Sequence, residues 1–431
     1  PPYAVTTRMA SVLPVSPRPR IAPARTAKPH FLDALASRAV HARLRGIEHG
    51  ELVIVDGQHH YLYGRRSNAC MHAATVTVHD ARFYADMAFG GSIGAGEAYM
   101  QGWWSVDDLT ALVRVLLSNR GVLDGMEGGL ARLTGPVQKT LHWLNRNTRE
   151  GSRRNIAAHY DLGNDFFRLF LDPTMMYSSA IFECDDMTLE QAQTARLERI
   201  CRKLELKPDD HLLEIGTGWG GMALHAARHF GCRVTTTTIS REQYELARER
   251  IAGAGLEDRV TVLLEDYRDL SGRYDKLVSI EMIEAVGHQF YDTYFAQCGR
   301  LLADDGLMLL QAITIADQRY EAARRSVDFI QRYIFPGSTI PSVTAMLDSI
   351  TRASDMRLVH LEDIGTHYAK TLRLWRENFL REAGAVRALG YPESFLRMWE
   401  FYLCYCEGGF EERVIGDAQM LLAKPGNRSL R

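Results

Sequence analysis

The sequence lacks any apolar run close to the ~20 residues that a helix needs to cross a bilayer, so contact with a membrane would be peripheral. It also lacks a charge surplus, because 51 Lys and Arg residues stand against 53 Asp and Glu residues. The net charge of -2 provides no overall field for holding nucleic acid. Cysteine is scattered without a C-x-x-C pair, which argues against a disulfide framework or a zinc site and favours a reducing cytoplasm. The cysteines are Cys70, Cys184, Cys201, Cys232, Cys298, Cys404 and Cys406.

The first 32 residues contain no acidic side chain and no continuous apolar segment of the kind found in secretory signals. They are rich in proline and arginine instead. We expect residues 1–30 to be a disordered basic tail, with Met9 as a candidate natural start and a transit peptide as the alternative.

Residues 31–130 combine alternating apolar runs with a helical period, which predicts a small α+β domain. The runs are "ELVIVDG" and "ATVTVHD", and the helical stretch is "DDLTALVRVLL". Residues 131–154 follow as a basic amphipathic linker in which Glu150 is the single acid. Such a helix either packs between domains with a solvated polar face or settles on anionic lipid, and both interpretations stay open.

From residue 155 to residue 431, short apolar runs alternate with helical periods, the pattern of a parallel sheet covered by helices on both faces. After these runs we expect a helical insertion at about residues 316–383. The runs are "HLLEIG", "CRVTTTTI", "RVTVLLED", "DKLVSIEM" and "GLMLLQAITI".

A glycine-rich turn follows the first of these runs, and βα turns of this kind bind adenosine cofactors. Its spacing is G-x-G-x-G, at Gly216, Gly218 and Gly220. A dinucleotide site would place an acid about 20 residues further on, whereas this chain has "TTTTISREQ" there. The dinucleotide interpretation therefore fails. Asp266 and Tyr267, after the third run, are suited to contact an adenine amine and ring face.

Seven ordered motifs resemble those of the cyclopropane fatty acid synthases, S-adenosylmethionine-dependent methyltransferases that act on phospholipid acyl chains. They are "HYDLGNDFFRLFLDPTMMYSSAIF", "LEIGTGWGG", "TTISREQ", "DYRDL", "IEAVG", "RYIFPG" and "YLCYCEGGF". The resemblance runs from about Gly91 to Phe410, because "GSIGAGEAYMQGWW" also resembles the first domain of that family. It implies an α/β fold: a Rossmann-like class I methyltransferase domain with a mostly parallel seven-stranded sheet and a helical lid, after a smaller α+β domain. It also implies that these residues surround the cofactor: Tyr177, Ser178, Gly216, Gly218, Gly220, Thr238, Ser240, Gln243, Asp266 and Tyr267.

Two of these positions have a structural alternative, because Thr238 and Ser240 also suit a strand end and a helix N-cap. Gln243 has fewer such alternatives. It lies on the first turn of the following helix, where its amide can reach the ribose hydroxyls.

An alkene in a lipid tail cannot be activated by removing a proton, so catalysis depends on placing a sulfonium methyl group against the π bond. The attack leaves a carbocation, which a dry pocket lined by aromatic rings protects from water. A base must then remove a proton. By the resemblance this base is a bound bicarbonate held by Glu284 and oriented by Tyr368. Glu281 matches no acid of the family, and we expect it to be structural.

The chain departs from many bacterial members of that family at polar positions. Ser179, Ala285 and Gln311 stand where a cysteine and two histidines are usual. Ser179 and Gln311 can hydrogen-bond an anion, but neither titrates near neutral pH. Bicarbonate, Glu284 or Tyr368 is therefore the expected base.

Several further residues have both a functional and a structural interpretation. Cys406 matches a family cysteine once regarded as catalytic, but the reaction needs no thiolate, so we expect a buried apolar role. In the insertion, arginines such as Arg324 and Arg332 would meet lipid phosphate while aromatic residues line an acyl channel, or the segment is a solvated helix with a core stripe. Aromatic candidates for the pocket, which are also ordinary core residues, are Tyr160, Phe166, Phe167, Tyr177, Phe182, Tyr333 and Tyr368.

These observations predict an enzyme that transfers a methylene group from S-adenosylmethionine to the cis double bond of an unsaturated phospholipid acyl chain, forming a cyclopropane. If the base takes a proton from a neighbouring chain carbon, the product is a methylene or methyl branch. A non-catalytic lipid-binding protein and a methyltransferase of small molecules also stay open as interpretations. We expect residues 31–130 to engage lipid on the inner face of the cytoplasmic membrane, without metal or nucleic acid. The resemblance allows a homodimer.

Overall fold

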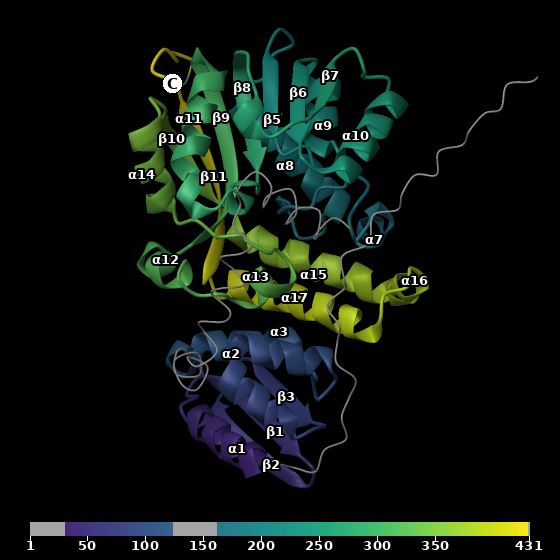
Figure 1. Cartoon of the computed structure of the whole chain (residues 1–431), viewed down its shortest axis with the longest axis vertical. Coiled ribbons are helices and arrows are strands. Elements are labelled where there is room, and N and C mark those ends of the chain that lie inside the picture. Colours follow the sequence, from purple (N-terminus) through teal and green to yellow (C-terminus); the bar gives the residue numbers. More distant parts are fainter. Residues whose placement is uncertain (1–30, 124–161, 430–431) are drawn as a thin grey trace, which may run out of the picture.

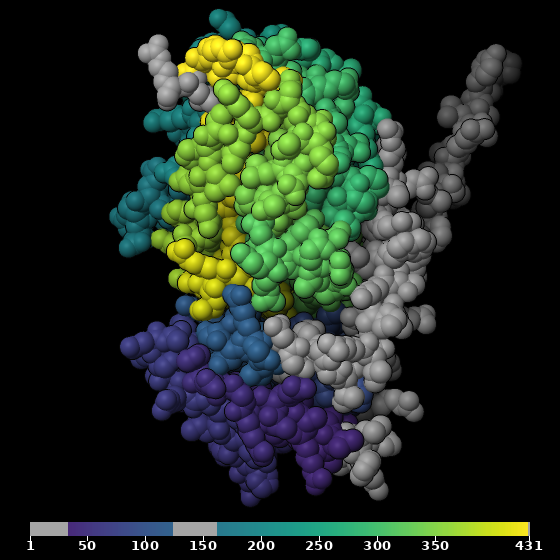
Figure 2. Space-filling view, turned by 90° about the vertical axis from the view of Figure 1, so that its left-hand side faces the viewer, coloured from purple at the N-terminus to yellow at the C-terminus, as the bar shows by residue number. Residues whose placement is uncertain are grey.

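The computed structural model describes residues 31–123 and 162–429, so the predicted tail and linker and Tyr160 lie outside the described residues. Two domains are stacked along the long axis of the molecule (Figure 1). Figure 2 shows them as a smaller lobe, purple to blue, below a larger lobe, green to yellow. In the part of the chain that is described, no helix combines the length and the apolar character that a membrane crossing requires.

The first domain has the predicted α+β composition. Its four-stranded sheet has the order β2-β1-β3-β4, with β1 antiparallel to β2 and parallel to β3. Leu52 and Ile54 of β1 are buried because alternate residues of a strand face the same side. The elements are α1 (Phe31–Leu44), β1 (Gly50–Asp56), β2 (His59–Arg65), β3 (Ala73–Val78), α2 (Arg82–Met100), β4 (Trp104–Val106) and α3 (Leu109–Ser118).

The second domain contains the predicted mostly parallel sheet of seven strands, in the order β10-β11-β9-β8-β5-β6-β7. The pairs from β9 to β7 are parallel, and β11 is antiparallel to both of its neighbours. The strands are β5 (His211–Ile215), β6 (Arg233–Thr238), β7 (Val260–Leu264), β8 (Tyr274–Ile280), β9 (Leu302–Ile315), β10 (Arg357–Asp363) and β11 (Ile415–Ala423).

Both faces of this sheet are covered, as its continuous apolar runs predict. Leu213 and Leu277 pack into one apolar cluster, whereas their neighbours Leu212 and Val278 pack into another on the opposite face. The α-helices are α7 (Asn164–Arg168), α8 (Leu189–Lys203), α9 (Gly221–Phe230), α10 (Arg241–Gly253), α11 (Tyr291–Leu301), α12 (Asp317–Ala323), α13 (Phe329–Tyr333), α14 (Val343–Ala353), α15 (Gly365–Arg381), α16 (Ala383–Ala388) and α17 (Glu393–Glu411).

The helical insertion predicted at about 316–383 is wrong in extent. Only α12 and α13 leave the sheet as a helical excursion, because α14 packs beside α11 and β10 is the outermost strand. The side chains of β10 are mostly exposed, so its sequence has the weak apolar alternation of an edge strand. From the sequence, this weak pattern could not be distinguished from that of the helices before and after the strand.

The two domains meet through α17, which lies with α15 between the large sheet and the first domain (Figure 1). Gly408 of α17 allows this approach, because a Cβ there would stand 2.5 Å from Val113 of α3. Beside it, Thr110 donates a hydrogen bond of 3.1 Å to Glu407. The two domains are thus closely packed.

Helix α13 also docks on the first domain. The fully buried ring of Phe329 lies against Gly96 of α2, where a Cβ would come within 2.5 Å of the ring. Arg332 forms an ion pair of 2.9 Å with Glu97, and Tyr333 donates a hydrogen bond to the same carboxylate. Arg332 is therefore already paired, which weakens its predicted role at a lipid phosphate.

We expect Gly96→Ala to destabilise the protein by about 1–3 kcal/mol, because the new methyl group overlaps a ring that has no room to move. Gly90→Ala is the matched control, since a Cβ at Gly90 on the same helix meets nothing within 4 Å. Urea unfolding should show a lower free energy of unfolding for Gly96→Ala only. Equal stability of the two variants would contradict this packing.

Candidate active site

The glycine turn has a backbone that residues with side chains rarely adopt. Gly216, Gly218 and Gly220 have φ angles of 104°, 51° and 86° between the end of β5 and the start of α9. A Cβ on Gly218 would meet no protein atom within 4 Å, so this part of the turn faces open space. The turn thus leaves bare backbone for a ligand to approach.

The segment that carries Tyr177 and Ser178 packs against this turn. A Cβ on Gly221 would stand 2.5 Å from the sulfur of Met176, and Arg250 donates hydrogen bonds of 2.6 and 3.2 Å to the carbonyls of Trp219 and Thr174. The Ser178 hydroxyl is buried without a hydrogen-bond partner among the described residues. A buried polar atom of this kind needs a partner, which a polar cofactor would supply.

The next strand end carries Thr238, Ser240 and Gln243 close together. Thr238 Oγ1 donates a hydrogen bond of 2.8 Å to the side-chain Oε1 of Gln243. The Ser240 side chain caps α10 by accepting a hydrogen bond from the backbone N–H of Gln243. Thr238 and Ser240 thus have the structural roles of a strand end and a helix N-cap. These contacts leave the side-chain Nε2 of Gln243 without a hydrogen bond to another described residue, so it can donate a hydrogen bond to a ligand.

Asp266 and Tyr267 follow β7, as predicted, with Asp266 in an ion pair. Arg268 binds both carboxylate oxygens of Asp266 at 2.7 Å, and the Tyr267 ring packs edge-on against Tyr294. The carboxylate expected at an adenine amine is therefore held by a neighbouring guanidinium. Taken with the bare turn, the buried Ser178 hydroxyl and the Gln243 amide, the residues present fit S-adenosylmethionine.

A cluster of carboxyl groups lies beside the turn, with the partly buried Glu281 at its centre. Ser179 N–H and Gln311 Nε2 donate to Glu281 Oε1 over 2.9 and 2.7 Å, and Tyr368 O–H donates to Oε2 over 2.6 Å. The Ser179 hydroxyl instead donates to the Ala180 carbonyl. Glu281, expected to be structural, thus receives hydrogen bonds from Ser179, Gln311 and Tyr368. With this carboxylate in place, the residues present do not fit a bicarbonate.

Asp417 of β11 completes the polar cluster. Gln419 Nε2 donates to Gln311 Oε1 over 3.0 Å, which turns Gln311 Nε2 towards both Glu281 and Asp417. Burial, and then the neighbouring Glu281 carboxylate, raise the pKa of Asp417 well above its ordinary value. The fully buried guanidinium of Arg196 is a nearby positive charge.

Glu284 lies next to this cluster in the 3-10 turn Ile283–Ala285. Its Oε1 accepts a hydrogen bond of 2.5 Å from Ile313 N–H, while its buried Oε2 has no partner among the described residues. Burial, and then Glu281, raise the pKa of Glu284 to about 8. Glu284 is thus predominantly a neutral acid at neutral pH.

Aromatic rings enclose the cluster. Trp375 of α15 is fully buried, with its ring centroid 5.2 Å from Tyr177 and 6.0 Å from Tyr368. Phe410 stacks on Tyr368 at 4.5 Å, and Tyr402 shares a hydrogen bond of 2.9 Å with Tyr177. These rings make an apolar wall around the acids.

The remaining candidates are ordinary packing residues. Phe166 and Phe167 are fully buried in an edge-to-face cluster, and Phe182 lies under the Lys370 ammonium group. Cys406 is half-buried against the same apolar core, and burial raises the pKa of its thiol. A thiol held in its neutral form fits the apolar role expected for it.

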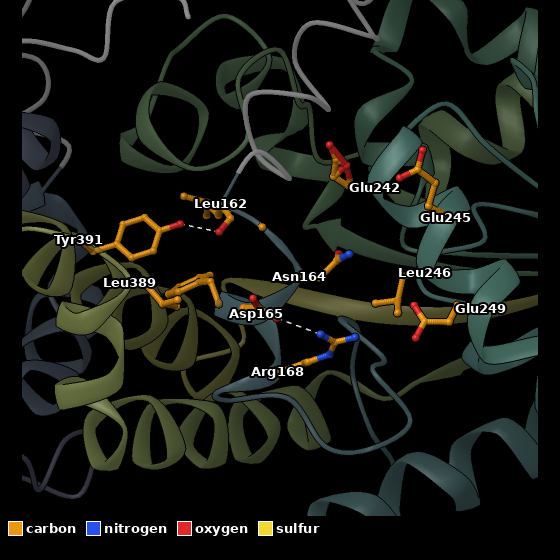
Figure 3. A pocket seen from close by; sticks show the side chains of 12 residues that line it. Leu162, Asn164, Asp165, Arg168, Glu242, Glu245, Leu246, Glu249, Leu389 and Tyr391 are labelled. Carbon is orange, nitrogen blue, oxygen red and sulfur yellow. Dashed lines mark hydrogen bonds and ion pairs between the residues drawn. The ribbon is translucent and has the colours of Figure 1, made fainter. Parts of the chain in front are cut away.

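A hollow of about 500 Å³ opens elsewhere on the surface, between α7, α10 and the loop after α16. Figure 3 shows Glu242, Glu245 and Glu249 on one side of it and Tyr391 on the other. None of the predicted catalytic residues lines it, and its acidic side is unsuited to a phospholipid headgroup. The acid cluster is therefore the better candidate site.

Sequence reasoning assigns no functional role to three residues of this site, Glu281, Asp417 and Trp375. Glu281 follows a strand end directly, the same signal that singles out Glu284, but it lacks a counterpart in the family motifs. Asp417 is an acid in an otherwise apolar strand, which is a usable signal. Trp375 has no local signal, because a tryptophan on a helix is usually core. In the described part of the chain, no group of three or more His, Cys, Asp or Glu residues is arranged to hold a metal ion.

We expect Gly218→Ala to weaken binding of S-adenosylmethionine about tenfold or more, because the methyl group fills the space that faces the ligand. Gly57→Ala is the matched control: its φ of 60° is similar, and its Cβ would also meet nothing within 4 Å. Calorimetric titration should show the loss only for Gly218→Ala. Unchanged affinity would place the cofactor elsewhere.

The raised pKa of Glu284 predicts that stability falls as pH rises. Between about 4.5, its ordinary pKa, and about 8, the folded state keeps a proton that the unfolded state releases. Glu284→Gln should therefore flatten the fall in the free energy of unfolding between pH 5 and pH 8, measured by urea unfolding. The exposed Glu257→Gln serves as a control and should keep the wild-type slope. An unchanged slope in Glu284→Gln would contradict the assignment.

Comparison with known proteins gives a consistent result. The family described as mycolic acid cyclopropane synthetase matches residues 147–420. A tuberculostearic acid methyltransferase of Mycobacterium tuberculosis is 40% identical over 356 residues, covering 78% of this chain and 80% of that protein. The cyclopropane-fatty-acyl-phospholipid synthase of Escherichia coli is 38% identical over 369 residues, covering 83% of this chain and 90% of that protein.

A solved structure agrees with these sequences. A mycolic acid cyclopropane synthase in complex with S-adenosylhomocysteine and CTAB has a TM-score of 0.59 and 34% identity, covering 63% of this chain and 98% of that one. The predicted class I methyltransferase fold and dependence on S-adenosylmethionine are thereby confirmed. This chain belongs to the mycolic acid cyclopropane synthetase family.

Proposed function

We propose that this protein transfers one carbon from S-adenosylmethionine to the cis double bond of an unsaturated phospholipid acyl chain and closes a cyclopropane ring. The observation that carries the proposal is an acid cluster, enclosed by aromatic rings, directly beside the glycine turn. Met282 lies between Glu281 and Glu284 in the sequence, and its side chain lies 3.3 Å from where a Cβ of Gly216 would stand. Donor site and acid cluster therefore share a wall.

The chemistry requires this combination. When bound, S-adenosylmethionine supplies an electrophilic methyl group to the π electrons of the alkene. The rings of Tyr177, Trp375 and Tyr368 exclude water and present electron-rich faces, each able to stabilise a desolvated cation by on the order of 2 kcal/mol. A protein site for a proton must lie within reach of the new carbon, and the cluster supplies carboxyl groups there.

The phospholipid substrate is proposed because the relative from Escherichia coli, which this chain covers to 90%, is named a cyclopropane-fatty-acyl-phospholipid synthase. We further propose that the first domain engages the membrane surface. A branched product is the second candidate, because the relative from Mycobacterium tuberculosis is named a methyltransferase and not a cyclopropane synthase. The two products differ in which proton the base removes.

The test is incubation of the purified protein with unsaturated phospholipid vesicles and S-adenosylmethionine labelled with ¹³C in the methyl group. We expect the label in a three-membered ring, seen as high-field proton signals in the NMR spectrum of the extracted lipid. Vesicles of saturated phospholipid are the control and should take up no label. Label in an alkene or methyl branch would establish the second candidate, and no label in lipid would refute both.

A further inference from the structure

Glu281 adopts a backbone conformation that is unusual for a residue with a side chain. Its φ angle is 48°, in the left-handed region, directly after β8. That region costs a residue other than glycine on the order of 1 kcal/mol. The neighbouring backbone holds it there, because Glu281 N–H donates a hydrogen bond of 2.7 Å to the Gln311 carbonyl. The strained backbone aims the carboxylate into the cluster.

Three separate parts of the chain supply donors to this carboxylate. Ser179 precedes α8, Gln311 lies in β9 and Tyr368 lies in α15. By the family resemblance Tyr368 would orient a bicarbonate, and Ser179 and Gln311 are residues that can hydrogen-bond an anion. Here each donates a hydrogen bond of 2.6–2.9 Å to a carboxylate that belongs to the protein itself.

The other two acids of the cluster are shifted towards their protonated forms, and a protonated carboxyl group does not act as a base. Burial and then the charge of Glu281 raise the pKa of Asp417 well above its ordinary value and that of Glu284 to about 8, which favours the protonated form of both carboxyl groups. Glu284 Oε1 is also occupied by Ile313 N–H. Gln311 cannot act in their place, because an amide does not titrate near neutral pH.

We propose that the Glu281 carboxylate is the built-in base of the reaction and replaces a bound bicarbonate. This inference rests on the proposed function. The π electron pair of the alkene forms the bond to the methyl carbon, and the electron pair of the broken C–S bond stays on sulfur. One C–H bond of the added carbon then breaks. Its electron pair closes the ring on the cationic chain carbon, and its proton passes to Glu281, which becomes a neutral carboxyl group.

The first test compares activity with and without bicarbonate. Wild-type protein should form product at an unchanged rate in buffers depleted of carbon dioxide. Glu281→Gln should lose about 100-fold or more of that rate, the usual contribution of a general base, while calorimetry shows that S-adenosylmethionine still binds. Glu257→Gln, an exposed acid outside the site, should keep the wild-type rate. A wild-type enzyme that stops without bicarbonate, or an active Glu281→Gln, would overturn the proposal.

The second test needs no turnover. Glu281→Gly suits the left-handed backbone and exposes the three donors, so millimolar bicarbonate should raise its melting temperature and restore its activity. The wild-type melting temperature should not respond. A response of the wild-type protein, or none in a folded Glu281→Gly, would refute the assignment. If that variant does not fold, the wild-type measurements decide. Failure of the proposed function would appear differently, as wild-type protein that makes no lipid product in any buffer.

Discussion

The carboxyl groups of Asp417 and Glu284, both buried, and of Glu281, partly buried, share the centre of this structure with the buried guanidinium group of Arg196, and this constraint governs the arrangement around them. Burying an unpaired charge is costly, so a protein either pairs the charge, supplies hydrogen bonds or leaves the group protonated. The chain uses all three. Arg196 provides positive charge, Glu281 receives three hydrogen bonds, and Asp417 and Glu284 are shifted towards their neutral forms.

The sheet makes this arrangement possible, because it brings distant residues to one edge. Glu281 leaves the end of β8, Gln311 lies on the neighbouring β9, and Asp417 lies on β11 beyond it. The same carboxyl edge carries the glycine turn after β5. Parallel strands therefore place the cofactor turn and the acids in one region, and α15 closes it with Tyr368 and Trp375.

Much of this could be predicted from local sequence. The apolar runs identified the five strands from β5 to β9, and glycine spacing located the turn, because both signals depend on neighbouring residues. The edge strand β10 could not be predicted, because its side chains are mostly exposed and its apolar alternation is weak. The partners of Glu281 could not be predicted for another reason. Glu281 is 102 positions from Ser179 and 87 positions from Tyr368 in the sequence, and no local pattern indicates such distant contacts.

Helix α17 has a consequence for how the protein is made. Its contacts with α3 join residues almost 300 positions apart, as in the Thr110 to Glu407 hydrogen bond with a separation of 297. The ribosome therefore releases the first domain long before the helix that covers α3 exists. The side of that domain that α17 covers therefore stays exposed through most of synthesis. The first domain is made early but is among the last parts of the protein to reach its final packing.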